Sequence, residues 1–498
     1  MKKAKTIGEL RRSGYPLFSI KEEMRQNLIR MRKEREETFP GIIGYSRTVI
    51  PALENAILSK HDFILLGLRG QAKSRILREL IRLLDQEIPL VQGCPINDHP
   101  FHPVCIPCKR KVEENGEDVE IEWLPREFRY GEKLATPDVT MADLIGDIDP
   151  VKAASERIAL SDERAINYGI IPRTNRGIFA INELPDLPPR IQVGLLNILQ
   201  ESDIQIRGFT VRLPLDLLLV FTANPEDYTN RGNIITPLKD RLDAQIMTHY
   251  PKTIEDAKKI TDQEAWTKRE GGPDLIIPDY LREIIERIAF EARKSDYVDQ
   301  SSGVSARVTI SSLESLYSNL ERRAILTGEE KISARIIDLQ AIIPALTGKI
   351  ELVYEGEQEG AFRVGRFLIG RAVKSVFSDY FPDPHRTKSK GQVEGEERSI
   401  YKPIIDWFSK GNRVQISDEM PFKEYAEALH KVDGLKEITL RHLPLKGKEE
   451  LATGMEFALE GLCQNSVLAK EDLDDKTAYR DMLMTMLGGI KEKDQFGD

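Results

Sequence analysis

Apolar and polar positions alternate in two different ways along this chain of 498 residues. Over residues 40–265, short apolar runs typical of buried strands are separated by stretches with helical spacing. The clearest runs are Phe63–Leu66, Gly177–Ile181 and Leu217–Thr222. Strands that alternate with helices favour a parallel sheet with helices on both faces. The pattern therefore predicts an α/β domain over this region.

Helical spacing dominates the chain after this region. Apolar residues at Ile284, Ile285, Ile288 and Phe290 recur with polar residues between them, which indicates an amphipathic helix. We expect residues 270–353 to form a small helical lid domain.

The two ends of the chain are also predicted to be helical. Residues 1–39 begin the chain with a charged helical segment, clearest over 21–37, and residues 354–498 form a mostly helical extension. Within that extension a helix is expected over 362–380, and the charged stretch 382–399 is typical of a solvated linker.

Composition narrows the class of protein. The chain has 72 lysines and arginines against 81 acidic residues, a net charge of −9, so no general basic field indicates binding to nucleic acid. Four cysteines are too few for a disulfide framework in a chain of this length. No apolar run reaches the roughly 20 residues of a membrane span, and the N-terminus lacks the apolar segment of a signal peptide. We expect a cytoplasmic protein.

The segment Gly67–Ser74 has the form of a phosphate-binding loop. It follows the apolar run Phe63–Leu66 and precedes a helix-like stretch, the order in which backbone N–H groups and a lysine can surround phosphates while a hydroxyl reaches Mg²⁺. An ordinary strand-to-helix turn is the alternative. The candidate residues for binding ATP are Gly67, Gly70, Gln71, Ala72, Lys73 and Ser74, with Ser74 as the Mg²⁺ ligand and Ile43 and Tyr45 as further contacts. Ala72 stands where a glycine is usual, and we expect it to have a negative φ.

A second apolar run ends in Asn182 and Glu183. A buried strand that ends in two acidic residues is the Walker B pattern, in which the first acid orients the Mg²⁺ shell and the second polarises the attacking water. Glu183 therefore has the catalytic position. Asn182 replaces the first acid with a neutral amide, which makes the Mg²⁺ affinity and the turnover less certain. The alternative is a buried strand with a polar end.

Three further polar residues follow in the order of a nucleotide-hydrolysing site. Asn224 ends the apolar run at Leu217–Thr222 and fits a sensor of the γ-phosphate. Arg241 is the candidate arginine finger, with Arg231 as a second choice, because a permanently charged guanidinium suits the spread charge of phosphoryl transfer. Arg307 is the candidate second sensor. A surface salt bridge is the commoner role for any single arginine.

The order of these motifs resembles that of AAA+ ATPases over about residues 40–350. The match is narrower with the ATPase subunit of magnesium chelatase and its MoxR-type relatives. It rests on Ala135–Asp138, Leu144–Asp149, Asn175–Gly177, Asn224–Glu226 and Leu238–Arg241, and on a predicted hairpin over 203–213. The resemblance implies an AAA+ sheet with a helical lid, ATP and Mg²⁺ as ligands, a homo-oligomeric ring such as a hexamer, and a protein partner with a von Willebrand factor A domain.

The segment 94–122 is an insertion with a separate chemistry. Three of the four cysteines fall within it, and Cys105 and Cys108 are spaced to offer two thiolates to one tetrahedral ion. With Cys94 and either His102 or His99 they form a candidate structural zinc site. The alternatives are a proline-stiffened loop with free thiols and a redox Cys-x-x-Cys pair. The redox pair is disfavoured because an acidic loop, in place of a helix, is expected after Cys108.

Three functions are consistent with these motifs. The first is an ATP-hydrolysing ring of the chelatase and MoxR type that remodels or loads a protein partner, although insertion of magnesium into a porphyrin is doubtful. The second is an ATPase of the enhancer-binding activator type, but the chain lacks its Gly-Ala-Phe-Thr-Gly-Ala-like loop and a helix-turn-helix. The third, which Asn182 favours, is a scaffold that binds ATP and hydrolyses it poorly.

Overall fold

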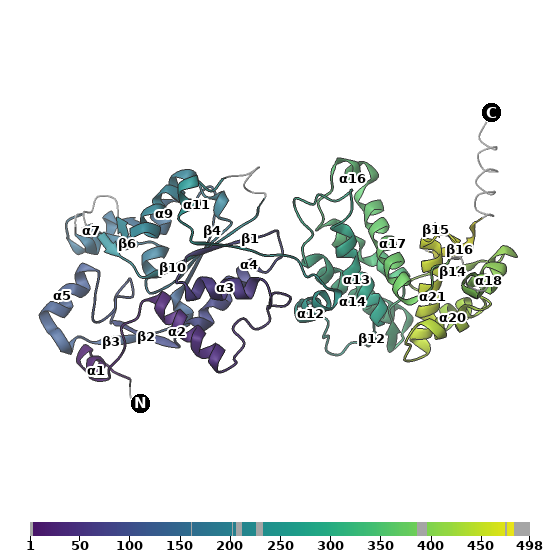
Figure 1. The fold of residues 1–498 in the computed structure, drawn as a ribbon, viewed down its shortest axis with the longest axis horizontal. Coiled ribbons are helices and arrows are strands. Elements are labelled where there is room, and N and C mark those ends of the chain that lie inside the picture. The colour runs from purple at the N-terminus through teal and green to yellow at the C-terminus, as the bar shows by residue number, and fades with distance from the viewer. Residues whose placement is uncertain are drawn as a thin grey trace, which may run out of the picture. The chain divides into compact units, whose positions relative to one another are not determined.

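The computed structural model describes residues 3–160, 162–201, 203–205, 212–225, 233–385, 396–473 and 476–482. The chain divides into two compact units, residues 1–250 and residues 251–498 (Figure 1).

A five-stranded parallel sheet forms the centre of the first unit (Figure 1). Its strands follow the order β11-β1-β10-β7-β4, and all four neighbouring pairs are parallel. The strands are β1 (Phe63–Leu66), β4 (Tyr130–Leu134), β7 (Gly177–Asn182), β10 (Leu217–Ala223) and β11 (Ala244–Met247). Both the predicted parallel sheet and its three clearest strands are therefore confirmed.

Helices cover both faces of this sheet. Along β1, Phe63 and Leu65 belong to one apolar core, whereas Ile64 and Leu66 belong to a second core, because successive side chains of a strand point to opposite faces. The second core continues into α9 (Pro189–Glu201). The first core continues into α2 (Ile20–Lys33), α3 (Val49–Leu58) and α4 (Lys73–Glu79).

Helix α2 is part of the first unit and not a separate leading segment. Its side chains Met24, Leu28 and Met31 are buried in the core shared with β1. Glu23 on the same helix forms a buried, bidentate ion pair with Arg129, whose two terminal nitrogens lie 2.7 and 2.6 Å from the carboxylate oxygens. Apolar packing and this ion pair together hold the N-terminal helix to the α/β core.

The cysteine-containing insertion lies between two antiparallel strands, β2 (Glu87–Val91) and β3 (Ile121–Pro125). The prediction of an acidic loop after Cys108 was wrong, because helix α5 runs from Ile106 to Asn115. The helix begins after Cys105, and Pro107 lies in its first turn. Proline is favoured there because the backbone N–H that it lacks would have no acceptor within the helix.

Short elements complete the first unit. They are α1 (Ile7–Arg12), α6 (Met141–Leu144), β5 (Gly146–Ile148), α7 (Pro150–Glu156), β6 (Ile166–Tyr168), α8 (Ile170–Arg173), β8 (Asp203–Gln205), β9 (Arg212–Pro214) and α11 (Thr236–Asp240). Strands β8 and β9 pair antiparallel, as the predicted hairpin requires, and its glycine turn lies outside the described residues.

Helices make up most of the second unit (Figure 1). They are α12 (Ile254–Glu264), α13 (Asp279–Ala292), α14 (Arg307–Thr327), α15 (Ile343–Thr347), α16 (Tyr354–Glu359), α17 (Ala361–Tyr380), α18 (Glu396–Ser409), α19 (Phe422–His430), α20 (Leu435–His442) and α21 (Lys448–Gln464). Helix α17 matches the helix predicted over 362–380. Most of the predicted linker lies outside the described residues, and its last residues belong to α18.

Two small sheets in this unit were not predicted. The strands β12 (Asp274–Ile276) and β13 (Lys331–Ser333) pair parallel. A three-stranded antiparallel sheet is formed by β14 (Val414–Ile416), β15 (Leu468–Leu473) and β16 (Lys476–Asp481).

The lid and the extension that the sequence predicted as separate domains share one apolar core. That core runs from Tyr280 in α13 to Tyr479 in β16. The same unit contains a buried ion pair, in which Arg323 donates to Asp338 at 2.6 Å. Asn319 donates to the same carboxylate oxygen at 2.9 Å. The chain divides at residue 250, ahead of the boundary expected at 265–270.

Among the helices of the described ranges, none is both long and apolar enough to cross a lipid bilayer.

Candidate functional site

The loop between β1 and α4 has the backbone of a phosphate cradle. Gly70 has a φ of +72°, which favours glycine. At Gly67 an added Cβ would lie 1.8 Å from Thr248 Oγ1 and 2.2 Å from Gln71 Oε1, so only glycine fits there. The expected negative φ at Ala72 was wrong, since its φ is +58°. This left-handed conformation costs a residue with a Cβ about 1–2 kcal/mol, which explains why glycine is usual at this position.

Lys73 begins helix α4 and turns its side chain back over the loop. Its ammonium donates to the carbonyl of Gly67, to Leu68 O at 3.1 Å and to Asn224 Oδ1 at 2.8 Å. The side chain is buried, so it depends on these polar partners. Lys73 and Asn224, which are 151 residues apart in the chain, therefore meet beside the loop.

Asn182 is the centre of a hydrogen-bond network at the end of β7. Its carbonyl oxygen accepts from Ser74 Oγ and from Thr222 Oγ1, each at 3.2 Å. Its amide group donates to Glu132 Oε1 at 2.5 Å. The candidate Mg²⁺ ligand Ser74 and the residue in the Walker B position are thus in direct contact.

The sequence interpretation missed Glu132. It lies on β4, the edge strand next to β7, where Leu134 is opposite Asn182. Its carboxylate also pairs with Arg78, with distances of 3.0 and 3.1 Å to the two guanidinium nitrogens. A carboxylate is therefore present beside Asn182, although the acid usual at position 182 is absent. Only the pairing of β4 with β7 reveals this, because 50 residues separate the two side chains in the chain.

Glu183 follows Asn182 at the end of β7, where the Walker B pattern has the acidic residue that polarises the attacking water. Its backbone has φ +55° and ψ +51°, a left-handed conformation that is strained for a residue with a side chain. Its N–H donates to Thr222 Oγ1 at 3.1 Å. Thr222 on β10 therefore contacts both Asn182 and Glu183 and fixes the end of β7.

Two tyrosines hold the phosphate loop from outside. Tyr45 Oη lies 3.0 Å from Gln71 O and 2.6 Å from His249 O, and burial raises its pKa to about 12. Tyr250 Oη donates to Arg69 O at 2.9 Å, a contact that the sequence did not indicate. Tyr45 thus supports the loop through its hydroxyl. Ile43 is partly buried, and its contact with a nucleotide stays a prediction.

The arginine assignments are not tested by these contacts. Arg241 follows α11 and donates to Pro237 O at 2.7 Å. Its Nε is buried and has no hydrogen-bond partner among the described residues. Arg307 begins α14 in the second unit and is exposed. Arg231 lies outside the described residues.

The cysteine insertion brings four candidate metal ligands together. Ligand atoms of Cys94, Asp98, Cys105 and Cys108 all lie within 4.8 Å of one another. This group includes Asp98 and neither of the two histidines that the sequence interpretation offered as the fourth ligand. His102 instead pairs with His99 through a backbone bridge, and their ring centres are 6.3 Å apart. Burial lowers the pKa of His99 to about 3.

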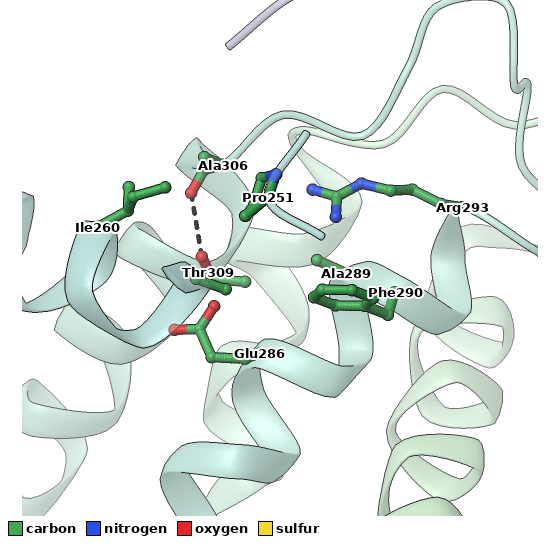
Figure 2. Close-up of a pocket in the computed structure, with 9 residues that line it drawn as sticks. Pro251, Ile260, Glu286, Ala289, Phe290, Arg293, Ala306 and Thr309 are labelled. Atoms are coloured by element: carbon green, nitrogen blue, oxygen red, sulfur yellow. Dashed lines mark hydrogen bonds between the residues drawn. The ribbon is translucent and has the colours of Figure 1, made fainter. Parts of the chain in front are cut away.

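The second unit contains a small pocket that is separate from the phosphate loop (Figure 2). It encloses about 10 Å³, the space of about one water molecule. Glu286 is buried beside Thr309 in this pocket, and burial raises the pKa of its carboxyl. A nucleotide cannot fit there.

Sequence comparisons relate nearly half of the chain to subunits of magnesium chelatase. No family model matches the chain. It is 28% identical over 228 residues to a magnesium-chelatase subunit ChlI homolog of Methanocaldococcus jannaschii, a match that covers 45% of this chain and 59% of that protein. It is 26% identical over 252 residues to the magnesium-chelatase 38 kDa subunit of Cereibacter sphaeroides, covering 48% of this chain and 68% of that subunit.

Solved structures show only distant similarity. A model of the complex between subunits BchI and BchD of magnesium chelatase has a TM-score of 0.34 at 20% identity, covering 64% of this chain and 98% of that one. A putative ATPase of Cytophaga hutchinsonii has a TM-score of 0.31 at 16% identity, covering 72% and 97% of the two chains. The sequence matches confirm the predicted resemblance: over nearly half of its length, this chain is similar to subunits of magnesium chelatase.

Proposed function

We propose that this chain binds MgATP in its first unit and hydrolyses it. The observation that carries the proposal is the meeting of five polar residues from three separate segments at the ends of parallel strands β1, β7 and β10. These residues are Lys73, Ser74, Asn182, Glu183 and Asn224. Ligands of α/β proteins commonly bind at this edge of the sheet.

Each residue has a chemical role in this proposal. Lys73 would exchange its loop carbonyls for phosphate oxygens, and Ser74 would ligate Mg²⁺ through its hydroxyl. Bound Mg²⁺ would supply positive charge against the phosphates. Glu183 would accept a hydrogen bond from the attacking water and take its proton, while Asn224 would orient that water or the γ-phosphate.

Glu132 bears on the rival function, an ATP-binding scaffold with weak hydrolysis. That alternative rests on the neutral amide of Asn182. Because the Glu132 carboxylate lies 2.5 Å from that amide, negative charge remains close to Ser74. We therefore favour a working ATPase in which Asn182 and Glu132 together replace the usual first acid.

The proposed assembly is a homo-oligomeric ring that remodels or loads a protein partner. It follows from the resemblance to magnesium-chelatase and MoxR ATPases, which also indicates a partner with a von Willebrand factor A domain. Arg241 would act as the arginine finger toward a neighbouring subunit's nucleotide. We do not propose magnesium insertion into a porphyrin, since the matched region covers under half of this chain and only 59% of the archaeal relative.

A two-variant experiment tests the proposal. Lys73→Ala should lose ATP binding in calorimetry, whereas Glu183→Gln should bind ATP and lose phosphate release, because the lysine acts on the ground state and the glutamate only on the reacting water. Arg30→Ala is the control, since this exposed arginine on α2 pairs with Glu34 at 3.1 Å and lies outside the phosphate loop. Equal ATP affinity for Lys73→Ala and the wild type would contradict the proposal. A wild type that binds ATP without phosphate release would favour the scaffold.

A further inference from the structure

The insertion between β2 and β3 holds a group of side chains that the ATPase site does not use. Cys94 follows the end of β2, and Cys105 and Cys108 lie at the start of α5. Asp98 lies in the loop between them. Two separate turns therefore carry this group, and they meet although no disulfide joins them.

The spacing of the group fits one small tetrahedral ion. With zinc–sulfur bonds of about 2.3 Å, two thiolates on a tetrahedral ion lie about 3.8 Å apart. The sulfurs of Cys94 and Cys105 are 4.0 Å apart, and the ligand atoms of all four residues lie within 4.8 Å of one another. A disulfide would need these sulfurs at about 2.05 Å.

Asp98 gives an independent indication that this group binds a cation. Its side chain is fully buried. One carboxylate oxygen accepts from Cys105 N at 3.0 Å, and the other has no hydrogen-bond partner among the residues that the structure describes. Leaving a buried carboxylate oxygen unpaired is costly. A cation at the centre of the group would satisfy it.

The donor atoms at this place suit zinc. Cys105 and Cys108 lie at the N-terminal end of α5, where the helix dipole stabilises negative charge. Cys94 Sγ also accepts from Asp98 N at 3.3 Å. Three sulfur ligands and one carboxylate are a donor set that zinc accepts, whereas Mg²⁺ and Ca²⁺ prefer oxygen alone.

We propose that Cys94, Asp98, Cys105 and Cys108 bind one structural zinc ion, which closes the insertion between β2 and β3. Asp98 is the fourth ligand, and His99 and His102 are not ligands.

Metal analysis of the full chain, purified under reducing conditions without chelators, tests the proposal. We expect about one zinc per chain, and we expect Cys108→Ser to lose it. Asp98→Asn should lower the zinc affinity, measured by competition with a chelator, by more than the roughly 10–100-fold typical of an altered outer-shell partner. His102→Ala and Cys463→Ser, a cysteine in α21, are the matched controls and should keep both zinc and affinity.

Cobalt substitution of the wild-type chain provides a measurement that needs no variant to fold. Co²⁺ in the same site should show the absorption bands of tetrahedral coordination and of several thiolate ligands. A metal-free protein with three reactive thiols in the insertion would overturn the proposal. A Cys94–Cys105 disulfide found by mass spectrometry in metal-free protein would overturn it in favour of a redox pair. Loss of zinc in His102→Ala, or unchanged affinity in Asp98→Asn, would overturn the assignment of Asp98.

Discussion

The substitution Asn182→Asp tests the network around Ser74 most directly. Aspartate has nearly the same shape as asparagine but replaces the N–H donor with an oxygen. That oxygen would face Glu132 Oε1, which now accepts from Asn182 at 2.5 Å. The contacts from Ser74 and Thr222 can persist, because both hydroxyls donate to Asn182 Oδ1. The substitution therefore changes charge at one point while leaving the packing in place.

The magnitude follows from the separation of the two carboxylates. Two like charges about 4 Å apart repel by about 4 kcal/mol at an effective dielectric constant of 20, and by about 1 kcal/mol in bulk water. The Glu132 side chain is 23% exposed and paired with Arg78, which screens part of this repulsion. We expect the variant to be less stable than the wild type by about 1–4 kcal/mol when no divalent cation is present.

Mg²⁺ should reverse the loss of stability that Asn182→Asp shows in the absence of divalent cations. A second carboxylate beside Ser74 attracts the ion and is in turn relieved by it, so the Mg²⁺ concentration for half-maximal ATPase should fall at least about fivefold, which corresponds to about 1 kcal/mol. Thermal unfolding should be measured in buffer free of divalent cations, without a chelator, and again with Mg²⁺. The double variant Asn182→Asp with Glu132→Gln should recover the metal-free stability. Superimposed Mg²⁺ titrations together with unchanged metal-free unfolding would refute the reasoning.

Three other predictions test separate features. Arg241→Ala should bind ATP yet hydrolyse it slowly, and mixing it with Glu183→Gln should restore part of the ATPase rate, because one interface can then combine both intact residues. Glu23→Ala should destabilise the first unit by about 3–5 kcal/mol in denaturant unfolding, since it leaves Arg129 charged and buried without its partner. Ala72→Val should lower thermal stability by about 1–2 kcal/mol, because a side chain branched at Cβ resists the left-handed conformation, whereas Ala72→Gly should not.

Each of these has its own control. A wild-type ATPase rate per chain that stays constant on dilution to monomers would contradict the role of Arg241. The exposed pair of Arg30 and Glu34, 3.1 Å apart on α2, is the control for Glu23, and Glu34→Ala should change stability by no more than about 0.5 kcal/mol. Equal unfolding midpoints for Ala72→Val and Ala72→Gly would show that the backbone at this position relaxes without cost.

The sequence predicted those parts of the site that are coded locally. Strand β1, the loop and the start of α4 are contiguous, so the apolar run and the glycines define them together. The contact of Lys73 with Asn224 was not predicted as such, but it fits the rule that parallel strands end at one edge of a sheet. The left-handed backbone of Ala72 could not be read from its side chain, because local propensity opposes it.

The residues that the sequence did not reveal depend on tertiary contacts. Glu132 lies in an edge strand of five residues that includes a lysine, so no apolar run marks it, and only pairing with β7 brings it to Asn182. Asp98 became a candidate ligand because the chain path buries it, whereas the commoner ligand type suggested His102. The three-residue strands β12 and β13 are too short to show any period.

The hydroxyl contact of Tyr250 links the chain that follows the first unit to the affinity of the phosphate loop for nucleotide. Tyr250 is the last residue of the first unit and is bonded to the loop carbonyl of Arg69, so the chain that continues to Pro251 is attached to the loop expected to hold the phosphates. Linkage is reciprocal. If bound nucleotide alters the geometry of this attachment, then tension on the chain at Pro251 must alter nucleotide affinity by an equal free energy.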